Sequence, residues 1–488
     1  MKKTKLLSRI IALLMCLLMM LSLFACKKDE PVAETTEETT SVDTDDGEEK
    51  LELPDVNYGG ELFTILGRSG DNGEWMRDLD ISSLSVESDQ VDQAVYQRNK
   101  KVEDAYGVDI VLITQDVVDL NKTLITTVGA GDDNYDLVAT HGRYVFDHII
   151  ANRASEIHDF KYIDLEKSWW LDNLEEVWTT PGGKLFAVNG DISYMYLGCM
   201  GGIYFNKDVL NAAKIELPYE YVRNDTWYYS TFKKMVMDAD ASVDGDGSGV
   251  IGQDIFAYVT ERFRGPGTVV ESTGIPPLIK GGDGKYSIGV KNQRIYDAAD
   301  DYMLLLQKPY AGMASSVAEM RDAFKKEKAV FIEDNLKEAP RFKQAGVDFG
   351  LVPIYKYDDS VGDLGLCVGS GTNTFMIPIT AAESDRERIS VVVEAMAYYG
   401  QKYMIPVYYD KILSYQSMQS PDDLEMLHRI RGAARIDLAE YLNPGDIKGT
   451  LFNSIESGVN YATVVAGLGK SVWIDLDTWY ALDNQQIN

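Results

Sequence analysis

Cysteine and histidine are scarce in this chain, which has four of each among 488 residues. Two of the cysteines lie within the first 26 residues, so only Cys199 and Cys367 remain in the body, where they allow one disulfide at most. The histidines offer little material for a zinc site or a histidine-based triad. His141 and His148, for example, lack the spacing of four residues that is typical of a zincin helix.

Positive charge and nucleotide-binding motifs are also in short supply. Lys and Arg number 47 against 77 Asp and Glu, which gives a formal net charge of −30. Because phosphate neutralisation needs clustered Lys and Arg, we expect no nucleic-acid partner. The sequence has neither a GxGxxG nor a Walker A motif, so no nucleotide pocket is indicated. After the first 26 residues no run of about 18 apolar residues occurs, so we expect the body not to cross a membrane.

The first residues carry a recognisable targeting signal. Basic residues precede an almost wholly apolar run from Ile10 to Ala25, and Cys26 follows it. This run is too short to span a bilayer comfortably, which favours a signal peptide over a membrane anchor. Its end, "LFAC", resembles the bacterial lipobox, and the resemblance implies that residues 1–25 are removed and that Cys26 is acylated. Phe24 stands where a small residue is usual, so cleavage without lipidation stays open.

Residues 26–55 form an acidic segment that is rich in Thr and Glu and nearly free of large apolar side chains before Leu51. Such a segment cannot bury enough surface to offset its ordering entropy, so it is expected to be a disordered tether. Acylation with more than one chain would then hold the body, 56–488, at the extracellular face of the cell membrane. The body is long enough for two domains or lobes.

The body alternates strand and helix patterns. A short apolar run, "ELFTILG" at 61–67, follows a Gly-Gly turn and predicts a strand. In "VDQAVYQRNKKVEDAY" at 91–106, apolar residues recur on one helical face. A strand, a helix and a strand follow at 108–114, 120–131 and 135–141, and a second strand–helix set lies between 315 and 354. This order predicts α/β sheets in two separate lobes.

Ligands of open α/β sheets bind at the carboxyl ends of strands. The rule points to the loops after 135–141, after the strand "AVFIE" at 329–333, and around "VGSGTNTFMIP" at 368–378. Arg143 lies just past the first of these strands, where an ordinary surface charge is the main alternative to a ligand contact.

A longer set of segments points to a family. The set runs through "YGGELFTILGR", "DQAVYQRNKKVEDAYGVDI", "YDLVATHG", "GGKLFAVNGDIS", "IYFNKDVL", "VDFGLVPIYKYD" and "VVVEAMAYYGQKYMIPVYYD". In this order the segments resemble the extracellular solute-binding proteins of family 1, the sugar-type lipoprotein receptors of bacterial ABC importers. No single segment is diagnostic, but the ordered set covers nearly the whole body.

The resemblance implies a periplasmic-binding-protein-like fold of type II-like architecture, with two α/β lobes joined by hinge strands and a ligand cleft between them. The expected parts are lobe 1 over 56–192, lobe 2 over 193–366, a return to lobe 1 over 367–418, and C-terminal helices mainly of lobe 2 over 419–488. The chain would cross near "GDISYMYLG" and "LGLCVGSGT", so Cys199 and Cys367 are expected to be neighbours, with a disulfide left open.

The same resemblance implies that the protein is not an enzyme. It would capture a solute, a carbohydrate or oligosaccharide, and deliver it to the permease subunits of an ABC importer, as a monomer that requires no cofactor. Two alternatives stay open. One is a secreted, lipid-anchored glycoside-active enzyme with paired carboxylates, although no spacing selects such a pair. The other is a receptor that presents its ligand to a sensor kinase.

A sugar has apolar C–H faces and hydroxyl edges, which suit aromatic platforms combined with Asp, Asn and Arg. The candidate ligand contacts are Arg143, Tyr194, Tyr196, Trp227, Glu333, Asn335 and Tyr408. Core packing is the alternative for each aromatic residue. Trp227 follows Asp225 and Thr226, which are typical helix caps, so it can also be a residue that packs at the start of a helix. Pro406 is expected to break a helix, which favours a surface position for Tyr408 or Tyr409.

The stretch "DGDGSGVIGQD" resembles part of a calcium loop. Asp244, Asp246 and Ser248 occupy positions 1, 3 and 5 of an EF-hand, but position 12 is Ile255 and Asp254 falls one residue early. A pair of EF-hands is missing, so a calcium sensor is not indicated. Two interpretations stay open: a structural Ca²⁺ that pins the loop through Asp244, Asp246, Ser248 and Asp254, and an acidic, Gly-rich turn without an ion.

Overall fold

The computed structural model describes residues 49–69, 80–81, 90–171, 173, 177–240 and 249–484. Cys26 and the proposed calcium ligands Asp244, Asp246 and Ser248 lie outside the described residues. No helix within the described ranges is long and apolar enough to cross a membrane.

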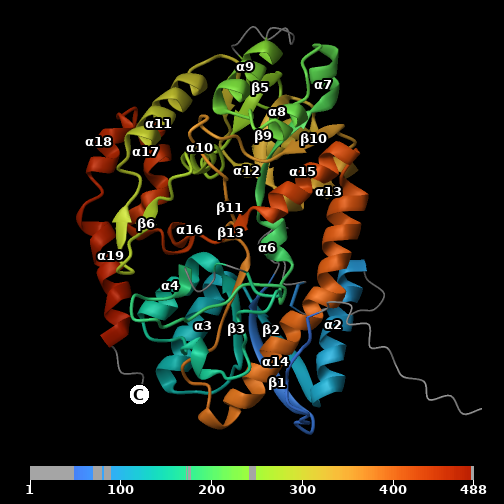
Figure 1. Ribbon diagram of the computed structural model, residues 1–488, viewed down its shortest axis with the longest axis vertical. Coiled ribbons are helices and arrows are strands. Elements are labelled where there is room, and N and C mark those ends of the chain that lie inside the picture. Colours follow the sequence, from blue (N-terminus) through green and yellow to red (C-terminus); the bar gives the residue numbers. More distant parts are fainter. Residues whose placement is uncertain are drawn as a thin grey trace, which may run out of the picture. The chain divides into compact units, whose positions relative to one another are not determined.

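The first sheet has the strand order β12-β3-β1-β2, and helices pack on both sides of it (Figure 1). β1 runs parallel to β2 and β3, whereas β12, which comes much later in the chain, is antiparallel to β3. The predicted β-α-β-α-β order is confirmed, and β3 is buried along its whole length, as the central strand of such a sheet should be. The elements are β1 (Glu61–Arg68), α2 (Gln90–Tyr106), β2 (Val108–Gln115), α3 (Val117–Ala130), β3 (Leu137–His141), α4 (Gly142–Ile150) and β12 (Asn373–Met376).

The second sheet forms the core of another lobe, in the order β10-β4-β9-β5-β8 (Figure 1). β5 is parallel to β8 and β9, and β4 is antiparallel to β9 and β10. The strands are β4 (Gly201–Asn206), β5 (Phe256–Thr260), β8 (Ala311–Met313), β9 (Ala329–Asn335) and β10 (Phe349–Val352). The helices of this lobe include α7 (Lys207–Ala212), α8 (Tyr219–Arg223), α9 (Tyr229–Asp240), α10 (Gly265–Ser272), α11 (Gln293–Leu306), α12 (Val317–Lys325) and α13 (Ala339–Gln344).

Short segments connect the two lobes. The first contains α6 (Met195–Gly198), and the second contains β11 (Leu366–Cys367), which pairs in parallel with β13 (Ala434–Arg435). The amide of Gly369 donates to the carbonyl oxygen of Cys199 at 3.1 Å, so the two connections lie side by side. The predicted proximity of the two cysteine-containing stretches is confirmed, and both Cys199 and Cys367 are free thiols.

A long helical arm returns from the first lobe to the second (Figure 1). It consists of α14 (Arg386–Tyr399) and two π-helical segments, η4 (Gly400–Met404) and η5 (Pro406–Ser417). The prediction that Pro406 breaks a helix is therefore wrong. Pro406 begins a new segment in the wider i→i+5 register, where its missing N–H costs little. As a result Tyr408 and Tyr409 are buried and do not lie on the surface.

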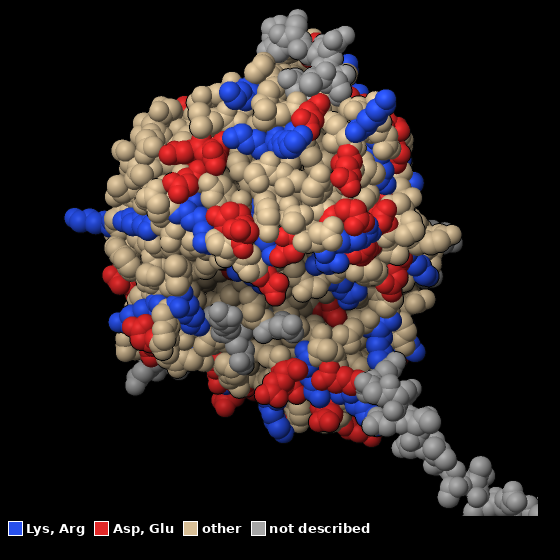
Figure 2. Space-filling model, turned by 45° about the horizontal axis from the view of Figure 1, so that its top comes forward, with Lys and Arg blue, Asp and Glu red and all other residues tan. Residues whose placement is uncertain are grey.

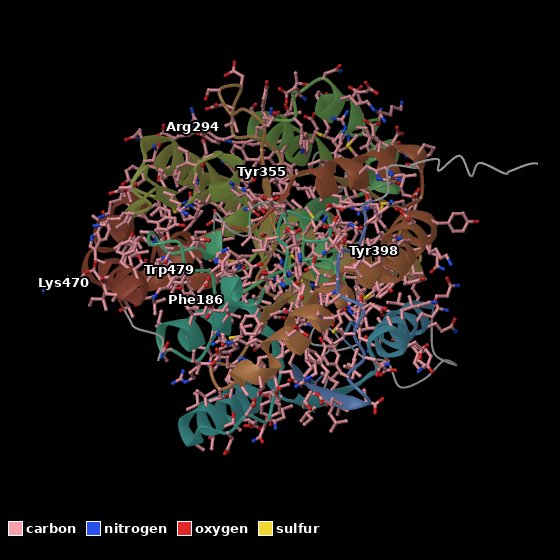
Figure 3. All side chains as sticks on the ribbon, turned by 60° about the horizontal axis from the view of Figure 1, so that its bottom comes forward. Phe186, Arg294, Tyr355, Tyr398, Lys470 and Trp479 are labelled. Atoms are coloured by element: carbon pink, nitrogen blue, oxygen red, sulfur yellow. The ribbon has the colours of Figure 1, made fainter. Side chains whose placement is uncertain are left out.

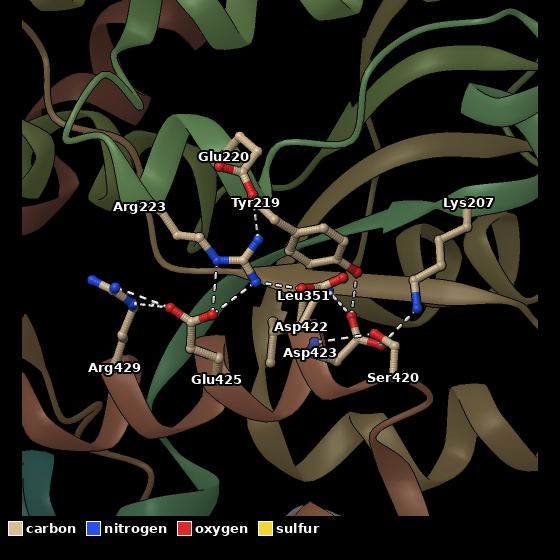
Figure 4. Close-up of polar contacts among 10 residues, drawn as sticks. All are labelled: Lys207, Tyr219, Glu220, Arg223, Leu351, Ser420, Asp422, Asp423, Glu425 and Arg429. Carbon is tan, nitrogen blue, oxygen red and sulfur yellow. Dashed lines mark hydrogen bonds and ion pairs between the residues drawn. The ribbon is translucent and has the colours of Figure 1, made fainter.

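The arm ends at α15 (Pro421–Gly432), which a buried polar network ties to the second lobe (Figure 4). Asp423 is fully buried and accepts hydrogen bonds from Lys207 Nζ (2.6 Å), Tyr219 Oη (2.5 Å) and Ser420 Oγ (2.8 Å). Beside it, Arg223 of α8 pairs with carboxylates of α15. These contacts fix the start of α15 against β10 and α7.

The C-terminal segment contacts both lobes. Trp479 of α19, labelled in Figure 3, packs on Phe146 of α4 with ring centroids 4.9 Å apart. Tyr461 of α18 meets Tyr296 of α11 edge to face. The elements are α16 (Leu438–Leu442), η6 (Pro444–Gly449), α17 (Thr450–Ser457), α18 (Tyr461–Ala466) and α19 (Lys470–Ala481).

Candidate ligand-binding site

The candidate site lies where polar strand ends from the two lobes approach the connecting segments. In the first sheet, Asn373 at the start of β12 pairs with His141 at the end of β3. In the second sheet, Gly201 at the start of β4 pairs with Asn335 at the end of β9. Because β4 follows α6 directly, this edge of the second sheet adjoins the first connection. On the face shown in Figure 2, basic and acidic side chains intermingle around a central hollow.

The wall from the first lobe is a closed hydrogen-bond network. Arg68 is buried at the end of β1, and it donates to Asn373 Oδ1 (2.7 Å) and to the carbonyl oxygen of Gly371 (2.6 Å). Asn373 Nδ2 donates to both carboxylate oxygens of Asp80, at 2.9 and 3.0 Å. Ser193, in the first connection, also donates to Asp80. The network therefore joins two strands of the sheet to the connecting segment.

His141 sits at the centre of this wall and caps α4. Its Nδ1 accepts the backbone N–H of Arg143, so Nε2 carries the proton of the neutral ring. Burial, and then the positive charges of Arg68, Arg143, Lys337 and Lys448, lower the pKa of His141 well below its usual value. The ring stays neutral near pH 7 and offers a hydrogen-bond donor.

The wall from the second lobe is built around Asp334 in β9. Arg321 binds this carboxylate with two hydrogen bonds of 2.6 and 2.9 Å, and Arg264, just after β5, lies 3.5 Å from it. Burial opposes ionisation of Asp334, but Arg321 holds its pKa below the usual value. Arg264 also donates to Asn335 Oδ1 at 2.7 Å. The two arginines therefore orient both polar residues at the end of β9.

An aromatic platform, which we did not predict, follows β5. Phe263 is 71% exposed, which is unusual for a phenylalanine. The guanidinium of Arg262 lies 4.7 Å from the ring centroid of Phe263 and 4.3 Å from that of Phe452 in α17. The available signal was the position of "ERFRG" directly after a strand, but sequence alone could not bring Phe452 next to it.

The predicted contacts Tyr194 and Tyr408 come together beside the first connection. Their rings are stacked with centroids 4.2 Å apart, and both are buried. A Cβ on Gly198 would lie 2.5 Å from Tyr408 Oη and 3.2 Å from the Cβ of Lys337, so Gly198 is required for this close packing. Tyr196 donates to buried Asp191 at 2.8 Å.

The other predicted contacts are distributed between the two lobes. Arg143 is exposed on α4 and covers the ring of Tyr144 at 4.9 Å. Asn335 lies at the strand edge described above. Trp227 and Glu333 belong to the core of the second lobe: the Trp227 indole donates to the carbonyl oxygen of Pro353 at 2.9 Å, and Glu333 accepts from Tyr258.

β9 extends to Asn335 and does not end at Glu333 as predicted, because it continues to pair with β4. Alternation along the strand turns Glu333 away from the face of Asp334 and into an aromatic core that includes Tyr258 and Tyr355. Tyr355 is labelled in Figure 3. Burial there raises the pKa of Glu333 to about 7.

Two hollows lie elsewhere on the second lobe. One, of about 560 Å³, is bordered by Trp227, by the residues after β10, and by β11 and β13. The other, of about 550 Å³, is an open depression over His428 and its neighbours on α15.

The proposed calcium loop is only partly described. Asp254 Oδ2 accepts the N–H of Val250 at 2.7 Å, which closes a local turn. Among the described residues, no three His, Cys, Asp or Glu side chains are grouped as a metal site. The calcium interpretation stays a prediction, because its other ligands lie outside the described ranges.

No family model matches the chain, and no curated protein matches it. Solved structures do match the fold. The GacH receptor of Streptomyces glaucescens, solved unliganded and with acarbose, is 13% identical, and the match covers 86% of this chain and 99% of that one with a TM-score of 0.56.

Two further structures match over similar lengths. A cyclo/maltodextrin-binding protein with maltotetraose is 11% identical, with coverage of 87% and 97% and a TM-score of 0.54. UgpB from Mycobacterium tuberculosis with glycerophosphocholine is 16% identical, with coverage of 81% and 98% and a TM-score of 0.56. Identities this low establish the fold alone: the described chain shares the periplasmic-binding-protein-like fold of these structures, and the predicted fold class of two connected α/β lobes is confirmed.

Proposed function

We propose that this protein is an extracellular solute-binding protein that captures a carbohydrate or oligosaccharide and delivers it to the permease of an ABC importer. The observation that carries the proposal is that polar strand ends from both lobes adjoin the two connecting segments, which lie side by side. The similar structures that contain acarbose, maltotetraose and glycerophosphocholine support it.

The chemistry of the described residues suits a hydroxylated ligand. His141, Arg264 and Asn335 offer donors and acceptors for hydroxyl groups, and Phe263 offers an exposed apolar face for sugar C–H groups. We assign the site no catalytic role. A glycosidase places a pair of carboxyl groups on either side of the glycosidic bond. Asp334 is held by Arg321, and the similar structures, a receptor and a binding protein for saccharides, support binding over hydrolysis.

The proposed location and partners rest on the sequence. Acylation of Cys26 and the acidic segment 26–55 would tether the body to the outer face of the cell membrane, within reach of the permease subunits. The protein would act as a monomer and would require no cofactor. For the loop of Asp244, Asp246, Ser248 and Asp254, a structural Ca²⁺ and an acidic turn without an ion remain the two interpretations.

Calorimetric titration of the purified protein with maltotetraose, acarbose and glycerophosphocholine tests the proposal. We expect binding without turnover. Phe263→Ala should weaken saccharide binding about fivefold, because an aromatic face contributes about 1 kcal/mol to such contacts. Tyr415→Ala, which removes an aromatic residue that is 87% exposed on the helical arm, is the matched control and should bind as the wild type does. Hydrolysis of any glycoside would contradict the proposal, and so would the failure of these compounds and of acidic saccharides such as trigalacturonate to bind.

A further inference from the structure

Lys337 lies between the two lobes, close to the residues of the candidate site. It belongs to the short 3-10 helix η2 (Leu336–Glu338), which follows β9 directly. Its stem packs against Gly198 in the first connection. The side chain keeps some exposed surface, so a solute can reach it. Burial, together with the nearby charge of Arg264, lowers the pKa of Lys337 from its usual value.

Lys337 forms no hydrogen bond or ion pair with any of the described residues, although it has carboxylates nearby in sequence. Asp334 is bound by Arg321 and Arg264. Glu338 is bound by Arg321 at 3.2 Å and by Arg341 at 2.8 Å. The arginines therefore occupy both carboxylates. Lys337 is half-buried, and burial lowers the pKa of its ammonium, so an anionic group in the cleft would find a partly desolvated cation that no carboxylate of the described residues holds.

On the side of the first lobe, Lys337 is one of several cations that act on His141. The others are Arg68, Arg143 and Lys448. These cations come from β1, α4, η2 and η6, so both lobes and the C-terminal segment contribute. Carboxylates accompany part of this set, because Lys448 pairs with Glu440 and Arg68 acts on Asp80. Lys337 and Arg143 form no ion pair with the described residues, and these two charges favour an anionic ligand.

We propose that Lys337 binds an anionic group of the captured solute, a carboxylate or a phosphate, so that the solute class is an acidic carbohydrate. This inference rests on the proposed function and narrows it. The neutral ring of His141 and the guanidinium of Arg264 would hold the adjacent hydroxyl groups. Lys337 would pair with the anion only when the solute is bound.

Two properties of Lys337→Met distinguish a binding lysine from a structural one. Removal of an unpaired ammonium should raise the melting temperature of the unliganded protein, whereas loss of a structural cation would lower it. The same change should weaken binding of an acidic solute about a hundredfold. Lys337→Arg keeps the charge and should retain most of the affinity. Lys343→Met, at an exposed lysine of α13, is the matched control.

The experiment is calorimetric titration of the wild type and these three variants with trigalacturonate, glucose 6-phosphate, inorganic phosphate and maltotriose, at low and high salt. We expect trigalacturonate or glucose 6-phosphate to bind more tightly than maltotriose, with a preference that high salt and Lys337→Met both abolish. Tighter binding of trigalacturonate would identify a carboxylate as the anion, and tighter binding of glucose 6-phosphate would identify a phosphate. The inference is overturned if neither acidic compound is preferred, or if Lys337→Met binds them as the wild type does.

Other outcomes separate this inference from the proposed function. Tight binding of maltotriose without a preference for acidic compounds would overturn the role of Lys337 and leave carbohydrate capture standing. Binding of inorganic phosphate that depends on Lys337, with no saccharide bound, would support the anion site and contradict the carbohydrate part of the proposed function.

Discussion

At the scale of single residues, Asp423 shows how much one buried carboxylate can hold together. It is fully buried and is bound to Lys207, which is itself buried. Asp423→Ala would leave the ammonium of Lys207 with only the more distant carboxylate of Asp348, at 4.0 Å, and the hydroxyl of Tyr219 without its acceptor. We expect the free energy of unfolding to fall by about 3–5 kcal/mol, as measured by chemical denaturation.

The neighbouring residue provides the control for this prediction. Asp422 pairs with Arg223, but its side chain is 45% exposed, so Asp422→Ala should cost less than about 1 kcal/mol. Equal losses for the two variants would show that the network around Asp423 does not fix α15.

At the scale of elements, the junction between α14 and η4 depends on a close approach of two backbones. Gly400 begins η4, and a Cβ there would overlap the carbonyl oxygen of Asp191 in the segment that leads to α6. Gly400→Ala must push the helical arm away from this segment, so we expect a loss of about 1–3 kcal/mol in thermal or chemical unfolding. Gly129→Ala, in α3 where a Cβ has open space, should be neutral or stabilising. A neutral Gly400→Ala would contradict this contact.

The elements also show what the sequence could predict. Apolar periodicity located β1, α2, β2 and β3 because their packing depends on local pattern. It did not locate the end of β9, since that strand continues by pairing with β4, which is distant in sequence. The π-helical register after Pro406 has no local signal either, so the burial of Tyr408 was missed.

The candidate site was harder to predict for the same reason. Tyr194 and Tyr408 were both candidates, but their stacking depends on how the arm crosses the first connection. Arg264, Phe263 and Lys337 were not candidates. These residues became candidates because of the side chains and charges that surround them in the folded chain, which the sequence does not show.

At the scale of the whole molecule, buried carboxyl groups recur in both lobes and in the connection between them. Four of them have a pKa that burial raises to about 7: Asp191, Glu271, Glu333 and Glu394. A carboxyl group whose pKa is near 4 in the unfolded chain and near 7 in the folded one holds its proton more tightly when folded. Its contribution to stability is therefore fully present below about pH 4 and is lost as the pH rises through 7.

Asp191→Asn tests this relation in the connecting segment. The amide oxygen can still accept the hydrogen bond from Tyr196, but the side chain no longer ionises. We expect the variant and the wild type to be similarly stable near pH 4, and the variant to be more stable by on the order of 4 kcal/mol near pH 8. Denaturant unfolding across this range measures the difference, with the exposed Asp359→Asn as the control. His148, whose pKa burial lowers to about 4, acts with the opposite sign, but it is common to both proteins and cancels in the comparison. A difference that does not grow with pH would mean that Asp191 is ionised in the folded protein throughout this range.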